Sequence, residues 1–349
     1  MRISSFRAAA AGAFIVAATL VPASAVAEPR ADGETIRFQN YAGSPSNMFA
    51  IVAQAKGFCT KYNFKCELVT LNSTPIGLQS LVGNAIDVAH IGTEAIVPAV
   101  LAGADIVLVG AVFYYSVVSV AVRSDDPVAT STDGYPAFLK TLKGKRVGVS
   151  SRGTSTEKYF EFMLRDAGMQ PSDVTFVAVG TPSDAYTALT VSKQIDAAIN
   201  VQPMNQLCEL NKTCKVVVNY SKGEGAKEVL AINGASVTNV MRRSMAEGQP
   251  KLMAAYYAAM KDAAAWIQDP RNLDEIVKIY KPLISFGAMP GADELRANWL
   301  KDFIKVLTPD YALKVSAVQA AIDFSYEAKL IDRKVDATKI IAKDAPQKP

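Results

Sequence analysis

Short apolar runs alternate with helix-like segments along the first part of the chain. The apolar runs predict buried strands at 35–40, 66–71, 85–90 and 106–112. Helical patterns lie between them and begin at about Asn47, at Ser73-Thr74-Pro75 and near Thr93. Strands that alternate with single helices are typical of a parallel sheet with helical crossovers. We therefore predict a small α/β lobe in this part of the chain.

The same order of strand and helix recurs further along. Strands are predicted at 146–150, 174–179 and 195–200, with helices at 154–167, 182–191 and about 202–210. The two stretches can be superposed so that Ile86-Asp87-Val88-Ala89 falls on Ile195-Asp196-Ala197-Ala198. The fold class that we predict is thus α/β with two lobes, each a parallel-rich sheet flanked by helices around its own core.

Two segments connect the predicted lobes. The β-branched and aromatic run 114–122 predicts a first crossing strand, and 228–233 predicts an extended return that ends at Gly234. After the return the pattern becomes helical, with helices expected at 250–268, 273–280, 293–306 and 311–328, and a frayed tail at 342–349.

Residues 1–27 have the pattern of a secretory signal peptide. Arg2 and Arg7 precede an uncharged apolar run, and Ala25-Val26-Ala27 supplies the small residues of a cleavage site. The run is shorter than the roughly 20 residues that a membrane-spanning helix needs. We expect export to the periplasm with cleavage after about Ala27. The rest divides into a discontinuous first lobe, 28–115 plus 234–349, and an inserted second lobe, 116–233.

Composition excludes several classes of function. Half of the residues are hydrophobic and a fifth are charged, as in ordinary globular proteins. The 37 Lys and Arg exceed the 33 Asp and Glu too little for nucleic acid to be the main partner. One histidine and four cysteines offer few ligands for a structural metal. We expect neither a metal nor a cofactor.

The four cysteines form two close pairs along the chain. Cys59 and Cys66 are seven residues apart, and Cys208 and Cys214 are six apart. Three pairings are possible, and the local one requires no assumption about distant geometry. In an oxidising compartment each local disulfide would stabilise the fold by about 2.5 kcal/mol in the chain-entropy model. The alternative is that the thiols are buried and unpaired.

Strand-to-helix turns supply the candidate binding residues, because ligands of open α/β sheets bind beyond the carboxyl ends of the strands. Four turns give Ser44, Ser46 and Asn47; His90, Gly92 and Thr93; Arg152, Gly153, Thr154 and Ser155; and Asn200 and Gln202. We add Tyr115, where the chain leaves the first lobe, since an aromatic ring there can either stack on a planar ligand or pack the crossing.

The third turn has the most informative chemistry. A glycine followed by hydroxyl residues at a helix start offers backbone N–H groups, hydroxyls and the positive end of the helix dipole. These groups suit a carboxylate, sulfonate or phosphate, and Arg152 could add a guanidinium or be a solvated surface charge. Alternatively, Thr154 or Ser155 caps its own helix.

No catalytic residue is expected. Asp87 and Asp196 lie at the starts of strands in different lobes, away from the ends that should face a ligand, so we assign them structural hydrogen bonds. His90 is the only histidine and lies near a strand's carboxyl end, where it could line the cleft. No G-x-S-x-G nucleophile motif accompanies it.

The chain from about Ile36 to Phe324 resembles the substrate-binding proteins of ABC importers for nitrate, alkanesulfonates and taurine, a group related to thiamine-pyrimidine binding proteins. The order and spacing of several short motifs carry the resemblance. They are 78–89 (LQSLVGNAIDVA), Gly92, 142–149 (LKGKRVGV), Gly153-Thr154-Ser155, Asp196-Ala197-Ala198 and Pro203.

The resemblance implies a type II periplasmic-binding-protein fold that closes on a small, usually anionic solute and delivers it to a membrane permease. Gly153-Thr154-Ser155 matches the segment that holds the anionic group in sulfonate binders. Gln202 departs from the acidic residue that relatives often carry before the proline, so a ligand cation would lack a partner there.

We therefore expect a solute-binding protein of an ABC importer, not an enzyme. Its expected partners are a small anionic or polar ligand (sulfonate, nitrate or carboxylate) and an ABC permease in the inner membrane, and the protein itself is expected to be a monomer. Two alternatives stay open. One is a pyrimidine-synthase-like enzyme on the same fold, and the other is a periplasmic ligand sensor for a membrane receptor.

Overall fold

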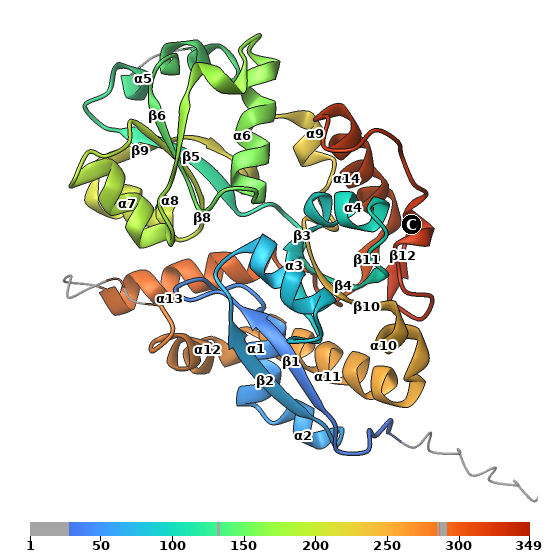
Figure 1. The fold of residues 1–349 in the computed structure, drawn as a ribbon. Coiled ribbons are helices and arrows are strands. Elements are labelled where there is room, and N and C mark those ends of the chain that lie inside the picture. The colour runs from blue at the N-terminus through green and yellow to red at the C-terminus, as the bar shows by residue number, and fades with distance from the viewer. Residues whose placement is uncertain (1–27, 131–132, 285, 287–291) are drawn as a thin grey trace, which may run out of the picture.

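The chain is folded into two α/β lobes that face each other (Figure 1). The structure, a computed structural model, describes residues 28–130, 133–284, 286 and 292–349. The predicted signal peptide at 1–27 lies outside the described residues.

The first lobe is built on five strands. They are β1 (Thr35–Asn40), β2 (Lys65–Thr70), β3 (Ala89–Gly92), β4 (Ile106–Phe113) and β10 (Val237–Arg242). Parallel pairing joins β1 to β2, and a parallel bridge between Phe38 and Val88 joins β1 to the segment that leads into β3. The returning strand β10 runs antiparallel between β3 and β4. The strands therefore follow the order β2-β1-β3-β10-β4 across the lobe.

The second lobe repeats this arrangement. Its strands are β5 (Val118–Arg123), β6 (Arg146–Val149), β7 (Thr175–Ala178), β8 (Ala197–Val201) and β9 (Cys214–Asn219), in the order β7-β6-β8-β5-β9. The strands β6, β7 and β8 are parallel, whereas β5 is antiparallel to both β8 and β9. Each lobe thus has one antiparallel strand in the fourth place, which confirms the predicted repeat and the two-lobed α/β fold.

Helices connect and cover the strands (Figure 1). The first lobe has α1 (Met48–Ala55), α2 (Phe58–Lys61), α3 (Thr74–Val82) and α4 (Thr93–Leu101), and the second has α5 (Pro127–Thr130), α6 (Ser155–Asp166), α7 (Pro182–Thr190), α8 (Met204–Asn211) and α9 (Lys227–Leu230). The C-terminal part adds α10 (Arg243–Gly248), α11 (Pro250–Gln268), α12 (Leu273–Tyr280), α13 (Ala292–Phe303) and α14 (Val315–Glu327). These bounds confirm the predicted C-terminal helices, with shorter ends.

One C-terminal helix joins the two cores. Helix α11 buries an alanine-rich face in the first lobe, whereas α14 contributes Ala321, Phe324 and Ala328 to the apolar cluster of the second lobe. Arg165 of α6 donates a hydrogen bond to the carbonyl of Ala328 at 2.7 Å. On its other side, Ser325 of α14 donates to the carbonyl of Glu94 in α4. The lobes are therefore linked by α14 as well as by the two chain passages.

Two expectations about local structure were wrong. The return segment 228–233 is not extended, because its first residues lie in helix α9 and Val229 and Ile232 turn into the apolar cluster of the second lobe. The tail at 342–349 is not frayed. Ala342 and Ala345 are buried, and β12 (Gln347–Lys348) pairs in parallel with β11 (Leu313–Lys314).

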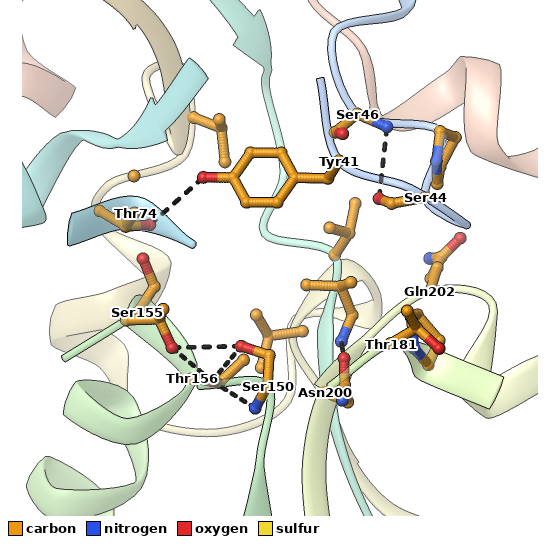
Figure 2. A pocket seen from close by; sticks show the side chains of 18 of the residues that line it. Tyr41, Ser44, Ser46, Thr74, Ser150, Ser155, Thr156, Thr181, Asn200 and Gln202 are labelled. Atoms are coloured by element: carbon orange, nitrogen blue, oxygen red, sulfur yellow. Dashed lines mark hydrogen bonds between the residues drawn. The ribbon is translucent and has the colours of Figure 1, made fainter. Parts of the chain in front are cut away.

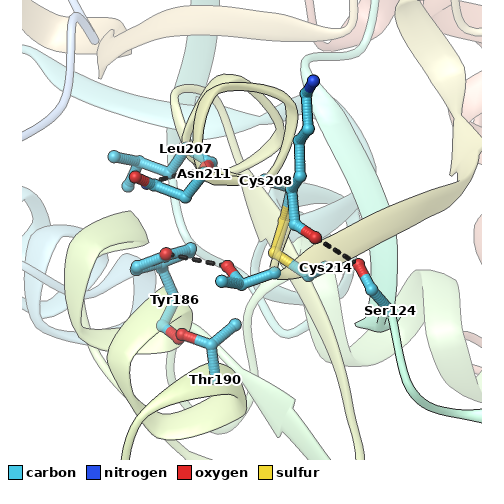
Figure 3. The surroundings of a disulfide bond; sticks show 9 residues. Ser124, Tyr186, Thr190, Leu207, Cys208, Asn211 and Cys214 are labelled. Carbon is cyan, nitrogen blue, oxygen red and sulfur yellow. Dashed lines mark hydrogen bonds between the residues drawn. A yellow bond between two sulfur atoms is a disulfide. The ribbon is translucent and has the colours of Figure 1, made fainter.

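Both predicted disulfides are confirmed. Cys59 is bonded to Cys66 and Cys208 to Cys214. The second bond ties the end of α8 to the start of β9 (Figure 3). Hydrogen bonds around it hold the intervening turn, since Ser124 donates to the carbonyl of Lys212 and the hydroxyls of Tyr186 and Thr213 are 2.8 Å apart.

The two repeated aspartates have the same structural role. In the first lobe, Asp87 accepts hydrogen bonds from the backbone N–H and guanidinium of Arg37, at 2.8–3.0 Å. In the second, Asp196 accepts the same bonds from Arg146, at 2.9–3.3 Å. Each pair ties the first parallel strand of its lobe (β1 or β6) to the segment that enters the third parallel strand (β3 or β8). The expectation of structural hydrogen bonds is confirmed.

Asp87 is the more deeply buried of the two carboxylates and has a second arginine at hydrogen-bond distance, whereas the second arginine of Asp196, Arg123, lies 3.9 Å away. Its side chain is 8% exposed, against 15% for Asp196, and Arg242 also donates to it at 2.7 Å. Burial by itself would raise the pKa of Asp87, but the hydrogen bonds from Arg37 and Arg242 hold that pKa below its ordinary value. The ionised form is therefore the form that the fold stabilises.

Asp87→Asn should lower the free energy of unfolding by about 3 kcal/mol at pH 7, because it leaves two partly buried guanidinium groups without their counter-charge. Asp196→Asn is the matched variant and should cost about 1 kcal/mol, since Arg146 is half exposed. Urea unfolding measures both values. Equal losses would contradict the assignment of Asp87 as the stronger tie.

Candidate ligand-binding site

A cavity of about 330 Å³ lies between the lobes, where the parallel strands of both sheets end. Residues of the first lobe face residues of the second across it (Figure 2). The first lobe contributes Tyr41, Ala42, Ser44, Pro45, Ser46, Asn72, Thr74, His90, Gly92, Phe113, Ser236, Val237 and Phe303. The second contributes Ser150, Thr154, Ser155, Thr156, Tyr159, Gly180, Thr181, Pro182, Asp184, Asn200, Val201 and Gln202, and the passage between the lobes adds Ser116, Val117 and Val118.

Eight predicted site residues line this cavity. They are Ser44, Ser46, His90, Gly92, Thr154, Ser155, Asn200 and Gln202. They come from all four turns that the sequence pointed to. The turns converge because the carboxyl ends of β1, β3, β6 and β8 all face the space between the lobes.

The other five predicted site residues lie outside the lining. Asn47 and Thr93 are buried behind it, where Asn47 donates to the carbonyl of Gln39 and Thr93 donates to the carbonyl of Ala235. Tyr115 is exposed and packs edge-on against the neighbouring Tyr114. Arg152 and Gly153 also lie outside the lining.

Arg152 and Gly153 are engaged by a carboxylate of their own helix. Arg152 pairs with Glu157 at 2.6 Å while its side chain stays 63% exposed, and the backbone N–H of Gly153 donates to the same carboxylate. Glu157 is thus placed in the first turn of α6 and binds the donors that we expected to be free for a ligand. Of the four predicted residues in this strand-to-helix turn, only Thr154 and Ser155 line the cavity.

The hydroxyl groups at the start of α6 form a connected cluster. Thr154 is the N-cap residue, yet its side chain makes no capping bond and instead donates to the carbonyl of Ser151 at 2.7 Å. The Ser150 hydroxyl lies 3.1 Å from that of Thr154 and 2.9 Å from that of Thr156 (Figure 2). The Thr154 side chain therefore does not cap the helix, although the residue occupies the N-cap position. The backbone N–H groups of the first helical turn have no partners within the helix.

His90 organises the wall of the first lobe. Its Nε2 accepts the backbone N–H of Asn47 at 3.3 Å, and its Nδ1 lies 3.1 Å from Oδ1 of Asn239. Because Nε2 is an acceptor, the proton of the neutral ring belongs on Nδ1, where it is donated to Asn239. Burial lowers the pKa of His90 to about 4. The ring is therefore neutral at physiological pH and fixes the loop that carries Ser44 and Ser46.

Two polar contacts join the lobes beside the cavity. The indole N–H of Trp299 in α13 donates to the side-chain oxygen of Gln202 at 3.1 Å. The hydroxyl of Tyr159 in α6 donates to the carboxyl of Glu94 in α4 at 3.2 Å. Burial raises the pKa of Glu94, and hydrogen bonds from Ser155 and Tyr159 offset this only in part.

Several lining residues were missed from the sequence. Thr74 and Thr181 lie in turns that marked the repeat, and their matching positions before Pro75 and Pro182 were an available signal. Phe303 arrives from a helix near the C-terminus, and no local pattern relates it to the site. Its ring packs edge-on against Phe113 at a centroid distance of 5.4 Å.

Charge is scarce in the lining. No Lys or Arg lines the cavity in the part of the chain that the structure describes. Asp184 is the one charged residue there, and its carboxylate accepts bonds from the N–H and hydroxyl of Thr181. Within the same residues, no cluster of His, Cys, Asp and Glu could hold a metal ion. Among the described helices, none has the length and apolar character to span a membrane.

Comparison with known proteins identifies the family. Residues 44–272 match the family described as NMT1/THI5 like, and the chain belongs to this family. A protein of Bacillus subtilis (strain 168) named as a putative aliphatic sulfonates-binding protein is 21% identical over 83% of this chain and 81% of its own length. The resemblance expected from the sequence motifs is confirmed.

Solved structures share the fold. A protein from Bordetella bronchiseptica RB50 matches with a TM-score of 0.73 at 22% identity, covering 90% of this chain and 94% of its own. The periplasmic aliphatic sulphonate binding protein of Escherichia coli matches with a TM-score of 0.64 at 20% identity, with coverages of 90% and 94%. The fold is thus that of periplasmic binding proteins.

The His90 ring should titrate near pH 4. As the only histidine of the chain, it gives a single imidazole signal in an NMR titration, and the neutral Nδ1–H form should persist at pH 5.5. A midpoint near the ordinary value of 6.5 would contradict the buried hydrogen-bonded placement.

The same group makes stability depend on pH. Since the pKa of His90 is lower in the folded than in the unfolded chain, the unfolded chain takes up the proton first, and stability falls as pH falls from about 6.5 to about 4. Between pH 7 and 5 this amounts to about 2 kcal/mol. Between pH 7 and 5, urea unfolding of His90→Gln should show a decrease in the free energy of unfolding that is about 2 kcal/mol smaller than that of the wild type.

Proposed function

We propose that this chain is the extracytoplasmic solute-binding component of an ABC importer. It captures a small polar solute in the cavity between its lobes and delivers it to a permease in the membrane. The observation that carries the proposal is the cavity itself, in which turns from both sheets meet around a volume suited to a small molecule. The family, and the sulfonate-binding names of relatives with the same fold, support it.

The proposed binding residues are the eight predicted residues that line the cavity, together with Tyr41, Thr74 and Thr181. The lobes are the discontinuous segment 28–115 plus 234–349 and the insertion 116–233. Closure about the two passages between them encloses the solute and excludes water. The contacts of Gln202 with Trp299 and of Glu94 with Tyr159 bridge the lobes and therefore belong to the closed arrangement.

The proposed location is the periplasm, after removal of residues 1–27, and the protein acts as a monomer without cofactor. Two disulfides at short separations agree with an oxidising compartment. Binding and release serve transport, so no chemical change of the solute is part of the proposal.

A thermal-shift screen tests the proposal. Sulfonates, nitrate, carboxylates, amides and amines are each added to the purified mature chain, and a true ligand should raise the melting temperature increasingly as its concentration exceeds its dissociation constant. Isothermal titration then gives its affinity. Absence of any binder across these classes would contradict a solute-binding role.

Thr154→Ala combined with Ser155→Ala should weaken the identified ligand by 10-fold or more. Each lost hydrogen bond to a polar ligand contributes about 0.5–1.5 kcal/mol, and more if the ligand is charged. Thr187→Ala with Ser192→Ala is the matched control, since both residues are exposed and lie outside the cavity lining. Unchanged affinity in the first variant, with an intact fold, would remove Thr154 and Ser155 from the site.

A further inference from the structure

Glu94 is a buried carboxyl behind the cavity wall. It lies in the first turn of α4, its exposed fraction is 0%, and no Lys or Arg pairs with it among the residues that the structure describes. Its side chain reaches across to the second lobe, where the Tyr159 hydroxyl donates to it at 3.2 Å. A buried carboxyl without a cation is costly unless hydrogen bonds compensate for the lost water, so the groups around Glu94 determine what it can do.

Glu94 sets the direction of two lining hydroxyls. Tyr159 and Ser155 both line the cavity. The Tyr159 hydroxyl donates to the Glu94 carboxyl at 3.2 Å, and the Ser155 hydroxyl lies beside the same carboxyl and favours its ionised form. The Ser155 oxygen and the carboxyl converge on Gly92, where an added Cβ would lie 2.3 Å from the former and 2.7 Å from the nearer oxygen of the latter. Since each hydroxyl has a single hydrogen, these two present lone pairs to a ligand.

Other hydroxyl groups of the lining also donate their hydrogen to protein acceptors, and so present lone pairs to the cavity. Thr154 donates to the carbonyl of Ser151 at 2.7 Å, Tyr41 to the carbonyl of His90 at 3.2 Å, and Thr181 to Asp184 at 2.7 Å. With no Lys or Arg in the described lining, an ionised ligand oxygen would meet lone pairs where these hydroxyls face the cavity. The lining also holds donors, among them the side-chain amide of Asn72 and the backbone N–H groups of the first turn of α6, which can bind a carbonyl-type oxygen.

We propose, on the basis of the proposed solute-binding function, that Glu94 is a positioning residue that selects the class of ligand. Through Ser155 and Tyr159 it makes this end of the cavity an acceptor surface, which takes the N–H or O–H groups of a neutral or cationic polar molecule such as an amide or amidine. The apolar side of the cavity, with Phe113 and Phe303, receives the body of that molecule. This differs from the anionic solute that the sequence resemblance implies.

Three probes with one carbon skeleton test the inference: benzamidine, benzamide and benzoate, with charges of +1, 0 and −1 at pH 7.5. Isothermal titration of the wild-type chain at constant ionic strength should give at least 10-fold tighter binding of benzamide and benzamidine than of benzoate. Ethanesulfonate, a second anion, should bind as weakly as benzoate. These wild-type ratios need no variant, so they stand whatever a substitution does to folding.

Glu94→Gln assigns the preference to this residue. The amide can donate as well as accept, so the ratio of benzamide to benzoate affinity should fall below 3-fold, chiefly through tighter benzoate binding. A purely structural role would weaken all probes together and leave the ratio unchanged. Glu161→Gln is the matched control. It removes a carboxylate from α6, the helix that carries Ser155 and Tyr159. Glu161 pairs there with Lys158 outside the cavity lining, and the variant should keep the wild-type ratio.

Tighter binding of benzoate or ethanesulfonate to the wild type, or an unchanged ratio in Glu94→Gln, would overturn this inference and leave the solute-binding function intact. Binding of no probe here and of no solute in the wider screen would count against the proposed function, and the inference would fail with it.

Discussion

The geometry of the site depends on the two passages of the chain between the lobes. Each passage leads into the antiparallel strand of one sheet, β5 in the second lobe and β10 in the first. These strands fix how each sheet is turned relative to the other, so that the carboxyl ends of both sets of parallel strands meet at one cavity. The helices that follow those strands then begin at the cavity, which brings their first-turn residues to it from both sides.

Ion pairs near the amino ends of the parallel strands, away from the cavity, connect the strands within each lobe. The Arg37–Asp87 and Arg146–Asp196 pairs repeat one interaction between the first parallel strand of each lobe and the segment that enters its third parallel strand. Charge is thus placed where it ties strands together and faces away from the ligand. Apart from Asp184, the described cavity lining consists of hydroxyls, amides, backbone groups and apolar or aromatic side chains, together with the neutral ring of His90.

Buried groups behind the lining determine what the lining offers. His90 uses both ring nitrogens to hold Asn47 and Asn239, and thereby positions the loop that carries Ser44 and Ser46. Glu94 lies behind the lining and contacts the hydroxyl of Tyr159. In both cases a buried group orients residues that line the cavity.

The sequence by itself determined the strands, the helices, the repeat, the local disulfides and the turns that meet at the site, because each of these depends on residues close together along the chain. It did not determine that Glu157 binds Arg152 and Gly153, that 228–233 begins in a helix and is not extended, or that Phe303 reaches the cavity. These outcomes depend on packing between distant segments and on competition among several donors for one acceptor. Only the tertiary structure decided them, because they follow from which side chains are brought together once both lobes are formed.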